Sequence, residues 1–264
     1  MSRLFCNGQP ADAVLLGAAL VNYGHFTSLQ VRNGAVQGWA LHLQRLQQAT
    51  HELFDATLDA AQVCAWLKDA LAHCDTRDAS VRITVFSRAF DFRQPLRAVP
   101  VDVLIGIAAP VTIPTTARAV MSLRYQRELP HIKHVGTFPL FHHRRQAMRE
   151  GFDDVVLLDE AGKVSEGSTW NLAFWDGAQV VWPQAAALRG VAERLLMAGL
   201  DRMGQGQVTR DVGLGELSGF DGAVACNASG VWPLARIDDV SFAQSDLLLQ
   251  VLQRALAEAP WEVL

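Results

Sequence analysis

Two charged residues lie in short segments whose neighbours could support chemistry. Lys133 lies in His131-Ile-Lys-His-Val-Gly136, and Glu166 lies in Ser165-Glu-Gly-Ser-Thr-Trp-Asn-Leu-Ala-Phe174. A lysine amine can bond covalently to a carbonyl group and can then move a proton as a general acid or base. A carboxylate beside a ring nitrogen keeps that nitrogen protonated. Taken singly, each residue also has a plain explanation, because a loop lysine is usually solvated and an edge-strand glutamate is usually exposed.

Two further segments carry side chains suited to an anion. Arg45 lies in His42-Leu-Gln-Arg-Leu46, and its planar guanidinium can make paired, charge-assisted hydrogen bonds to phosphate oxygens. Ser229 lies in the turn Asn227-Ala-Ser-Gly-Val-Trp-Pro-Leu234 and offers a hydroxyl group. Both residues could equally have structural roles, Arg45 on the wet face of a helix and Ser229 in ordinary turn chemistry.

A third segment, Ala187-Leu-Arg-Gly-Val-Ala-Glu-Arg-Leu195, turns into a predicted helix. Gly190 lets the backbone approach a ligand closely. The amides of Val191 and Ala192 lie at the start of the helix, where free N–H groups can bind an anion. The segment therefore predicts that backbone amides contribute to the anion site, beside the side chains of Arg45 and Ser229.

The order and spacing of these five elements resemble those of the fold-type IV pyridoxal-phosphate enzymes, the class IV aminotransferase family. Aminodeoxychorismate lyase and the D-amino acid and branched-chain aminotransferases are relatives within it. The resemblance implies that Lys133 binds pyridoxal 5'-phosphate covalently and that Glu166 meets the pyridine nitrogen. It also implies that Arg45, the amides at the start of the helix and Ser229 hold the phosphate.

The chain departs from the family pattern at three of these positions. Arg189 replaces a proline before Gly190, and Ala192 replaces a threonine whose hydroxyl adds a phosphate contact. A lost hydrogen bond to a charged group is worth about 1.5 to 3 kcal/mol if nothing replaces it, and Ser229 is a candidate replacement. Phe138 lies where branched-chain aminotransferases carry a tyrosine, which weakens a branched-chain interpretation.

The segment Tyr23-Gly-His-Phe-Thr-Ser28 resembles a longer family segment, Tyr-Gly-Asp-Gly-x-Phe-Glu-Thr, without its acidic residues. Tyr23, His25 and Thr27 are therefore predicted substrate contacts, with a structural role about equally plausible. Together with Phe138 they complete the set of predicted substrate-side residues.

The histidines and cysteines do not predict a metal site. His131, His134, His142 and His143 cluster in the sequence, but no carboxylate or thiolate follows them at ligand spacing. Some of these imidazoles are expected to line the mouth of the active site. The four cysteines are scattered without a CxxC pair, which argues against a disulfide framework and a structural zinc site.

The composition limits the partners and the compartment. Half of the 264 residues are hydrophobic, which excludes a disordered chain, and the net charge is −4. An acidic chain with a pI near 6.0 gives no reason to expect nucleic-acid binding. No apolar window is long enough to span a bilayer and no export signal is evident, so a cytoplasmic protein that does not contact membranes is expected.

The periodicity predicts alternating strands and helices. Short strands 29–32 and 35–37 flank Asn33-Gly34, a strong hairpin signal. Helices are expected from residue 41, around 63–71, at 139–150 and at 191–203, and a last helix at 246–257 with Ser245 as its cap. Strands are expected at 81–86, 101–106, 155–159, 163–175 and 179–182, and one begins at residue 222.

These elements and the resemblance predict a two-domain α+β, or α/β, protein of fold-type IV, similar in architecture to D-amino acid aminotransferase. Residues 1–108 form a small N-terminal α+β domain. Residues 109–118 contain two prolines and form the linker. Residues 119–264 form a larger domain that carries the lysine. The resemblance places the cofactor between the two domains and implies a homodimer.

The favoured function is a transaminase that moves an amino group between an amino acid and a 2-oxo acid. Aminodeoxychorismate lyase, which releases pyruvate to give 4-aminobenzoate, is the main alternative. A third hypothesis is a catalytically silent relative that keeps the fold as a binding scaffold, and the missing hydroxyl at Ala192 is its only support. Substrate side chain and stereochemistry are set by loops that carry no transferable motif.

Overall fold

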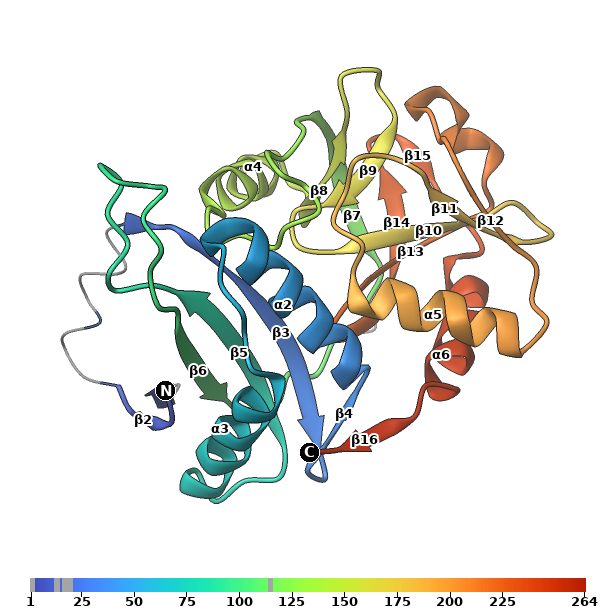
Figure 1. Ribbon diagram of the computed structural model, residues 1–264. Helices are drawn as coiled ribbons and strands as arrows, with labels where there is room; N and C mark the ends of the chain where they lie inside the picture. Colours follow the sequence, from blue (N-terminus) through green and yellow to red (C-terminus); the bar gives the residue numbers. More distant parts are fainter. Residues whose placement is uncertain (1–2, 12–14, 16–20, 114–115) are drawn as a thin grey trace. The chain divides into compact units, whose positions relative to one another are not determined.

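The computed structural model describes residues 3–11, 15, 21–113 and 116–264 (Figure 1). The chain forms two compact units. The first consists of Met1–Val111, Ile132–Gly136 and Trp261–Leu264, and the second of Thr112–His131 and Thr137–Pro260. The first unit is therefore built from three separate stretches of the chain.

The first unit is built on a seven-stranded sheet with the order β16-β4-β3-β5-β6-β1-β2. All of its strand pairs are antiparallel. The strands are β1 (Arg3–Cys6), β2 (Gln9–Pro10), β3 (Gly24–Arg32), β4 (Ala35–Gln37), β5 (Ala79–Phe86), β6 (Asp102–Ala108) and β16 (Trp261–Val263). The longest pairing joins β3 to β5, so these two strands form the rigid centre of the sheet.

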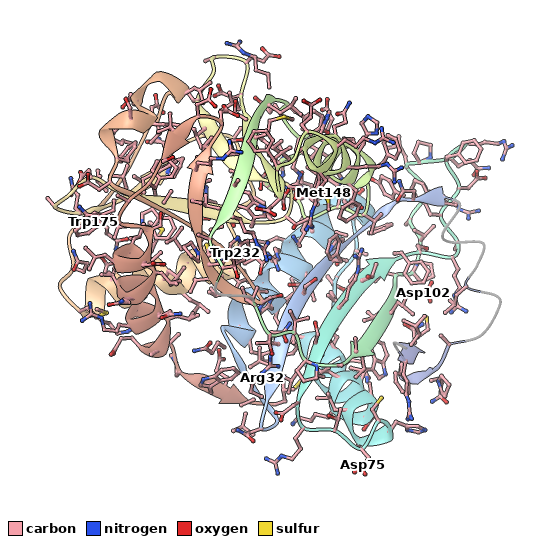
Figure 2. All side chains as sticks on the ribbon, turned by 180° about the vertical axis from the view of Figure 1, so that it is seen from behind. Arg32, Asp75, Asp102, Met148, Trp175 and Trp232 are labelled. Carbon is pink, nitrogen blue, oxygen red and sulfur yellow. The ribbon has the colours of Figure 1, made fainter. Side chains whose placement is uncertain are left out.

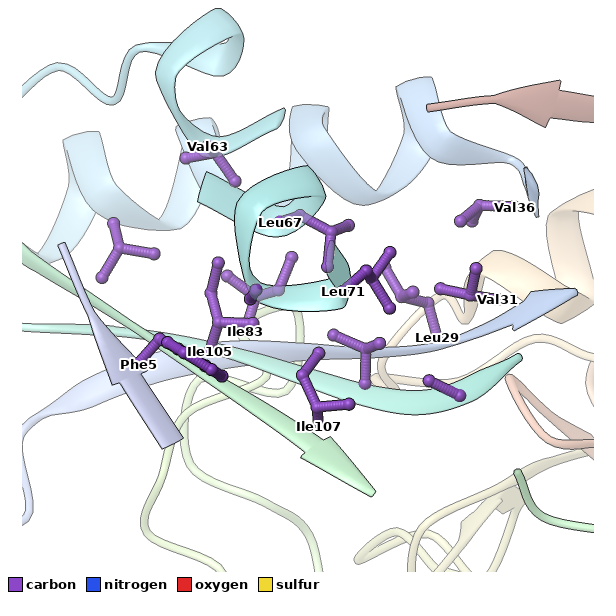
Figure 3. Packing of buried hydrophobic residues seen from close by; sticks show 14 of the residues in the cluster. Phe5, Leu29, Val31, Val36, Val63, Leu67, Leu71, Ile83, Ile105 and Ile107 are labelled. Carbon is purple, nitrogen blue, oxygen red and sulfur yellow. The ribbon is translucent and has the colours of Figure 1, made fainter. Parts of the chain in front are cut away.

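Two helices pack on one face of this sheet, α2 (Trp39–Phe54) and α3 (Ala60–His73). Leu67 and Leu71 of α3 meet Ile83 of β5 and Ile105 of β6 in a common apolar core (Figure 3). Because successive strand residues point to opposite faces, the alternate residues of β3 and β5 face these helices. Asp59 caps α3 by accepting hydrogen bonds from the amides of Ala61 and Gln62.

The hairpin predicted at Asn33-Gly34 is confirmed. Both residues have positive φ, 51° for Asn33 and 75° for Gly34, as the tight turn between β3 and β4 requires. The strand that precedes the turn is longer than expected, since β3 begins at Gly24. Its early part, Gly24 to Ser28, carries His25 and Thr27, two of the residues that were predicted to contact substrate.

The segment Ile132–Gly136 packs with the first unit. The amide of Phe26 donates to the carbonyl of Lys133, and the amide of Val135 donates to the carbonyl of Gly24, both at 2.9 Å. His25 and His134 form an isolated antiparallel bridge. The predicted division at 109–118 stays a prediction, but this segment adds Lys133 to the edge of β3 although it lies beyond the expected linker.

The second unit contains a nine-stranded sheet with the order β12-β11-β10-β13-β14-β7-β8-β9, and β15 pairs with β14 off this path. The sheet is mixed, because β7 runs parallel to β8 and β14, and β11 runs parallel to β12. The strands are β7 (Arg118–Arg124), β8 (Asp154–Leu158), β9 (Val164–Gly167), β10 (Asn171–Trp175), β11 (Val180–Pro183), β12 (Gln207–Arg210), β13 (Gly222–Asn227), β14 (Gly230–Ile237) and β15 (Val240–Ser241).

Three helices complete the second unit: α4 (Phe138–Arg149), α5 (Val191–Arg202) and α6 (Ser245–Ala257), with a short 3₁₀ helix, η2 (Leu214–Gly219). Helix α4 packs on β8 through Leu140 and Ala147. Helices α5 and α6 share an apolar core with β10, β11 and β13. Trp232 of β14 is buried in a further cluster, whereas Met148 of α4 is exposed (Figure 2).

The predicted cap of the last helix is wrong. Helix α6 begins at Ser245 itself, and the capping position is Gln244, which makes no side-chain cap bond. The Ser245 hydroxyl instead donates to the carbonyl of Leu234 at 2.6 Å and accepts from the amide of Ala223 at 3.0 Å. Because the hydroxyl is bonded to β13 and β14, it does not cap the helix.

The single strand expected at 163–175 is also wrong. The chain forms β9 and then β10, with Ser168, Thr169 and Trp170 between them. The amide of Gly167 donates to the carbonyl of Trp170 at 2.7 Å, which closes a tight turn. A Cβ atom at Gly167 would lie 2.0 Å from the Trp170 ring, so only glycine allows the indole to fold back at this point.

Across the described ranges, no helix is long and apolar enough to cross a membrane. In the same residues, no group of three or more His, Cys, Asp or Glu side chains is arranged to hold a metal ion.

Candidate active site

The first unit places a lysine amine beside an aromatic ring. Lys133 Nζ lies 5.0 Å from the centroid of the Phe26 ring, and the guanidinium carbon of Arg82 lies 3.6 Å from the same centroid. Phe26 is on β3 and Arg82 is on β5, which is hydrogen-bonded to it. Both side chains therefore lie at the Phe26 ring, whose quadrupole attracts positive charge.

Arg45 projects from α2 toward β3. Its Nη2 donates a hydrogen bond to the hydroxyl of Thr27, and that hydroxyl also lies 2.6 Å from Nδ1 of His42. Thr27 is fully buried and His42 is 2% exposed. Burial first, and then the positive charges of Arg45 and Lys133, hold the pKa of His42 well below its usual value. Arg45 and Lys133 are thus near enough to act on the same imidazole.

His25 and Tyr23 have internal partners. His25 Nε2 lies 3.0 Å from the Thr50 hydroxyl of α2, and burial, with a smaller contribution from Arg45, lowers the pKa of His25 to about 4. The Tyr23 hydroxyl donates to the carbonyl of Leu53 at 3.1 Å, and its ring stacks on Phe90. The predicted substrate contacts of both residues stay predictions, and these bonds give each of them a structural role.

The second unit holds Glu166 in a buried ion pair. Arg127 Nη1 donates to Glu166 Oε1 at 3.2 Å, and the two side chains are 5% and 7% exposed. The amide of Leu188 donates to the other carboxylate oxygen at 3.3 Å. Glu166 lies near the end of β9, which fixes its backbone. The carboxylate therefore has fixed donors on both oxygens, as a buried charge requires.

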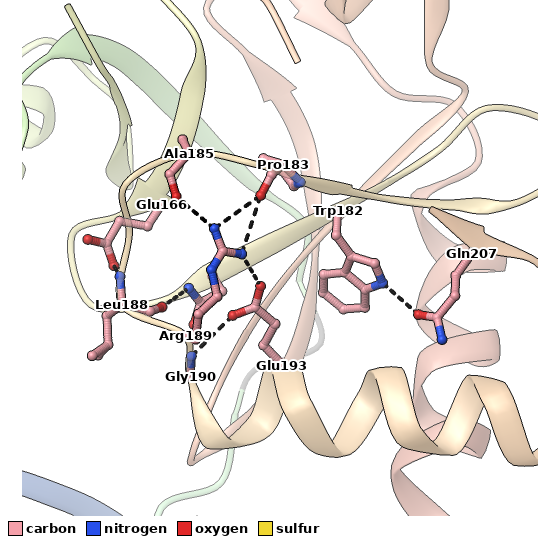
Figure 4. A network of polar contacts seen from close by, with 10 residues as sticks. Glu166, Trp182, Pro183, Ala185, Leu188, Arg189, Gly190, Glu193 and Gln207 are labelled. Carbon is pink, nitrogen blue, oxygen red and sulfur yellow. Dashed lines mark hydrogen bonds and ion pairs between the residues drawn. The ribbon is translucent and has the colours of Figure 1, made fainter. Parts of the chain in front are cut away.

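The turn that leads into α5 is organised by Arg189 (Figure 4). Its guanidinium donates to Glu193 Oε1 at 2.7 Å, to the carbonyl of Ala185 at 2.8 Å and to the carbonyl of Pro183 at 3.3 Å. Glu193 is 2% exposed, and its second oxygen accepts from the amide of Gly190 at 3.1 Å. The residue that replaces the family's proline therefore braces this turn with several hydrogen bonds.

Gly190 is required by a close neighbour. A Cβ atom at this position would lie 2.3 Å from Asn171 Oδ1, too close for any side chain without a shift. The Asn171 amide in turn donates to the carbonyl of Leu188 at 2.7 Å. Gly190 is the N-cap of α5, so the amides of Val191 and Ala192 are in its first turn, where N–H groups have no intrahelical acceptor.

Ser229 lies in the turn between β13 and β14. Its amide donates to Asn227 Oδ1 at 2.8 Å, and the Asn227 side chain donates to the carbonyl of Thr169 at 3.3 Å. Thr169 follows β9, the strand of Glu166. The adjacent Ser168 is 2% exposed, and no hydrogen-bond partner for its hydroxyl is found among the described residues.

Phe138 begins α4 and is 75% exposed, with its ring stacked on His142 at 5.6 Å between centroids. His143 lies beside Tyr125, 4.9 Å between ring centroids. The expected place of these histidines at the mouth of an active site stays a prediction.

The predicted site residues fall into two groups. Lys133, Arg45, Tyr23, His25 and Thr27 belong to the first unit, and Glu166, Gly190, Val191, Ala192, Ser229 and Phe138 belong to the second. Within the second unit, hydrogen bonds link the Glu166 strand to the Leu188–Gly190 turn and to the Ser229 turn. Within the first, Thr27 and His42 link Arg45 to β3.

Four side chains that contact the predicted site residues or their neighbours were not foreseen from the sequence: Arg127, His42, Asn171 and Arg82. His42 was quoted only as part of a motif around Arg45. Asn171 had a weak signal, because an asparagine close to a turn often bonds to nearby backbone. No sequence signal pointed to Arg127 or Arg82, because each contacts a residue that is distant in the sequence.

The donors in the two units suit the parts of pyridoxal phosphate. The first unit offers an amine for the aldehyde and a guanidinium for the phosphate, and the second offers a carboxylate for the ring nitrogen and helix-start amides for the phosphate. The buried Ser168 hydroxyl, which has no partner in the described part of the chain, lies two residues after Glu166 and marks a polar position available to a ligand. The residues present therefore fit this cofactor.

Comparison with known proteins identifies a family for most of the chain. The family model "Amino-transferase class IV" matches residues 24–237. That range includes Lys133, Glu166, Arg45 and Ser229. It also includes the Leu188–Ala192 turn, so every predicted cofactor contact lies within the matched part of the chain.

The fold is shared with solved branched-chain aminotransferases. The structure from Thermoproteus uzoniensis with norvaline has a TM-score of 0.86 at 17% identity, and covers 97% of this chain and 95% of its own. The Escherichia coli structure gives 0.84 at 16%, with 96% and 92% covered. The Thermobaculum terrenum structure in its PLP form gives 0.82 at 15%, with the same coverage. At these identities the likeness concerns the fold.

Proposed function

Because the chain belongs to the class IV aminotransferase family, we propose that it transfers an amino group between an amino acid and a 2-oxo acid. As a member of this family it is a pyridoxal-phosphate-dependent enzyme. The bound cofactor supplies an electron sink for the substrate carbon that gains or loses a proton. Holding the cofactor, orienting it and moving the proton fall to the side chains.

The observation that carries the proposal is the position of Lys133. The Lys133 carbonyl accepts a hydrogen bond from Phe26, and the amide of Val135 is bonded to Gly24, so the base of the side chain is fixed on β3. Its amine lies at the Phe26 ring. We assign to this amine the covalent bond to the cofactor aldehyde. When it is not bonded to the cofactor, this amine would move a proton at the substrate carbon.

The remaining groups hold the cofactor. We assign Glu166 to the pyridine nitrogen, because a carboxylate beside that nitrogen favours its protonated form. Arg45, the amides of Val191 and Ala192, and Ser229 are assigned to the phosphate. A guanidinium and helix-start amides both favour an anion.

Arg82 is our candidate partner for the carboxylate of the substrate. Amino acids and 2-oxo acids share a carboxylate group, and Arg82 lies on the same Phe26 ring as Lys133. Its planar fork can bind a carboxylate in a bidentate manner. We therefore assign Arg82 to the substrate carboxylate and expect Arg82→Gln to raise KM for both substrates more than it lowers kcat.

The test combines trapping and spectroscopy. Borohydride reduction followed by peptide mapping should place the cofactor on Lys133, and Lys133→Ala should remove both the label and the visible absorbance. Single amino acids, added one at a time, should convert the bound cofactor to its amine form. A cofactor trapped on another lysine contradicts the assignment, and a protein that takes up no added cofactor leaves only the scaffold hypothesis.

The lyase alternative is supported by two features of the sequence. The Phe26-Thr-Ser28 segment and the Cys226-Asn-Ala-Ser229 turn both look similar to those of aminodeoxychorismate lyase. Pyruvate release from aminodeoxychorismate, with no spectral change on adding any amino acid, would establish the lyase. Conversion to the amine form by an amino acid, without pyruvate release, establishes the transaminase.

We also propose a homodimer. Helix α4 exposes Phe138, Phe141 and Met148 on one side, at 75%, 51% and 59%. Exposed large apolar side chains grouped on one surface often mark a protein interface. Sedimentation equilibrium gives the test, because a mass equal to that of a single chain across the micromolar range contradicts the proposal.

A further inference from the structure

The hydrogen bonds around Thr27 carry an inference about Arg45. An arginine guanidinium carries only donors, so the Thr27 hydroxyl oxygen must accept from Arg45 Nη2. The hydroxyl proton then needs an acceptor of its own. Nδ1 of His42, 2.6 Å away, is the acceptor within reach. Thr27 is fully buried, and a buried hydroxyl proton without an acceptor is costly.

The tautomer of His42 follows from the same bonds. Arg45 Nη2 also lies 3.5 Å from His42 Nδ1, so two donors point at this nitrogen. Nδ1 must therefore carry a lone pair, which places the proton of the neutral imidazole on Nε2. Protonation of Nδ1 would turn an N–H group toward the guanidinium and set two positive charges side by side.

We propose that Thr27 and His42 are positioning residues that hold Arg45 in place for the cofactor phosphate, and this rests on the proposed function. His42 accepts the proton of the Thr27 hydroxyl, and the Thr27 oxygen then fixes one arm of the guanidinium. In this relay of hydrogen bonds from Arg45 to Thr27 to His42, the imidazole stays neutral and the guanidinium carries the only charge. Thr27, predicted from the sequence as a substrate contact, is thereby assigned to the phosphate end of the cofactor.

The geometry of β3 supports this assignment. Thr27 and His25 alternate with Phe26 along the strand, so they face α2 whereas Phe26 points to the opposite face. Lys133 Nζ lies at the Phe26 ring. Phe26, with Lys133 Nζ at its ring, and Thr27 therefore point to opposite faces of β3, so a change at Thr27 should act on phosphate binding more than on the bond to the aldehyde.

The test compares two forms of the cofactor on the apoprotein. Pyridoxal 5'-phosphate carries the phosphate, and pyridoxal does not. Thr27→Val removes the hydroxyl and keeps the β-branched shape, so it should weaken pyridoxal-phosphate binding about tenfold and leave the pyridoxal dissociation constant unchanged. Thr27→Ser keeps the hydroxyl and should bind both as the wild type does. Absorbance titration gives both constants.

A second pair of variants probes His42. Asparagine can place a carbonyl oxygen near the position of Nδ1, so His42→Asn should retain much of the preference for the phosphate form, whereas His42→Leu should lose it. A double-mutant cycle adds a check that a general loss of packing would not mimic. In an Arg45→Ala background, Thr27→Val should have no further effect on pyridoxal-phosphate affinity.

The outcomes separate this inference from the proposed function. A wild-type protein that binds no pyridoxal phosphate overturns the proposed function and this inference with it. A wild-type protein that is trapped at Lys133, with Thr27→Val binding pyridoxal phosphate normally, overturns the relay alone. Equal weakening of both cofactor forms by Thr27→Val also overturns it, because the hydroxyl would then act on the fold in general.

Discussion

Arg127 and Glu166 form an ion pair at 3.2 Å in which both side chains are nearly inaccessible to water. Arg127 comes from the segment that precedes Lys133 in the chain, and Glu166 comes from β9. A buried carboxylate is tolerated only with compensating charge or hydrogen bonds, and here Arg127 and the amide of Leu188 supply both. The pair therefore fixes where the negative charge of Glu166 lies before any ligand binds.

Arg127→Met should destabilise the protein by about 3–5 kcal/mol, because it leaves the Glu166 charge buried without its partner. Urea unfolding of the cofactor-free protein measures this. Arg127→Lys should lose less, since it keeps the charge but not the planar fork.

The exposed neighbour Arg124 provides the matched control for that experiment. Arg124→Met should change the free energy of unfolding by no more than about 0.5 kcal/mol, as surface substitutions usually do. An Arg127→Met protein that unfolds at the wild-type urea concentration would contradict the role given to the pair.

Arg189→Ala should loosen the turn before α5. It removes hydrogen bonds to Pro183, Ala185 and Glu193, and leaves a buried carboxylate without its guanidinium. We expect a loss of about 1–3 kcal/mol in stability and weaker binding of pyridoxal phosphate relative to pyridoxal. Urea unfolding and absorbance titration test the two effects.

The exposed Arg202 lies at the other end of the same helix and serves as the control. Arg202→Ala should leave both cofactor forms bound as before. If Arg189→Ala binds both forms normally, the bracing bonds do not position the amides of the turn.

Gly190→Ala should be poorly tolerated, because the new methyl group would lie 2.3 Å from Asn171 Oδ1. Overpacking of this kind costs about 1–3 kcal/mol. Thermal unfolding should show a lower midpoint, and pairing the change with Asn171→Ala should recover part of the loss if the clash is its cause.

A glycine in open space gives the comparison. A Cβ atom at Gly215 would meet nothing within 4 Å, so Gly215→Ala should unfold close to the wild-type temperature. Equal effects of the two glycine substitutions would mean that the Asn171 contact is unimportant.

Acid should destabilise the protein through His25. The pKa of His25 is lowered from 6.5 to about 4 by burial, so between these pH values the unfolded chain binds more protons than the folded one. The stability linked to His25 is therefore present above pH 6.5 and is lost as the pH falls toward 4, by about 3 kcal/mol in total. His25→Gln should flatten the pH dependence of urea unfolding in this window.

His42 adds to the same trend, since its pKa is also lowered, so His25→Gln should remove only part of the slope. His51 is on the exposed side of α2 and offers a control on the same helix as Thr50. His51→Gln should leave the slope as in the wild type, and an unchanged slope in His25→Gln would show that His25 is not buried as the fold requires.

Local signals in the sequence predicted most of the secondary structure. Asn33-Gly34 can take the positive φ values of a hairpin turn, so its position fixed the register between β3 and β4. The helix expected at 191–203 begins at Val191, directly after Gly190. These signals act between close neighbours, which is why they can be read without a fold.

Features that depend on tertiary partners could not be predicted from local signals. Ser245 has the chemistry of a helix cap, but its hydroxyl is bonded to two strands. The predicted strand began at residue 29, so nothing local indicated that His25 and Thr27 lie on β3 and face α2. Arg127 could not be assigned to Glu166, because the pair forms only when a loop and a distant strand meet.

The last strand of the first sheet has a consequence for biosynthesis. β16 pairs with β4, and Glu262 accepts a hydrogen bond at 2.8 Å from the amide of Trp39, the first residue of the helix that carries Arg45. During synthesis on the ribosome, this strand pairing and this hydrogen bond can form only after residues 261–263 have emerged. A fragment ending near residue 111 would present an open edge strand and lack Lys133, so it should aggregate and remain colourless.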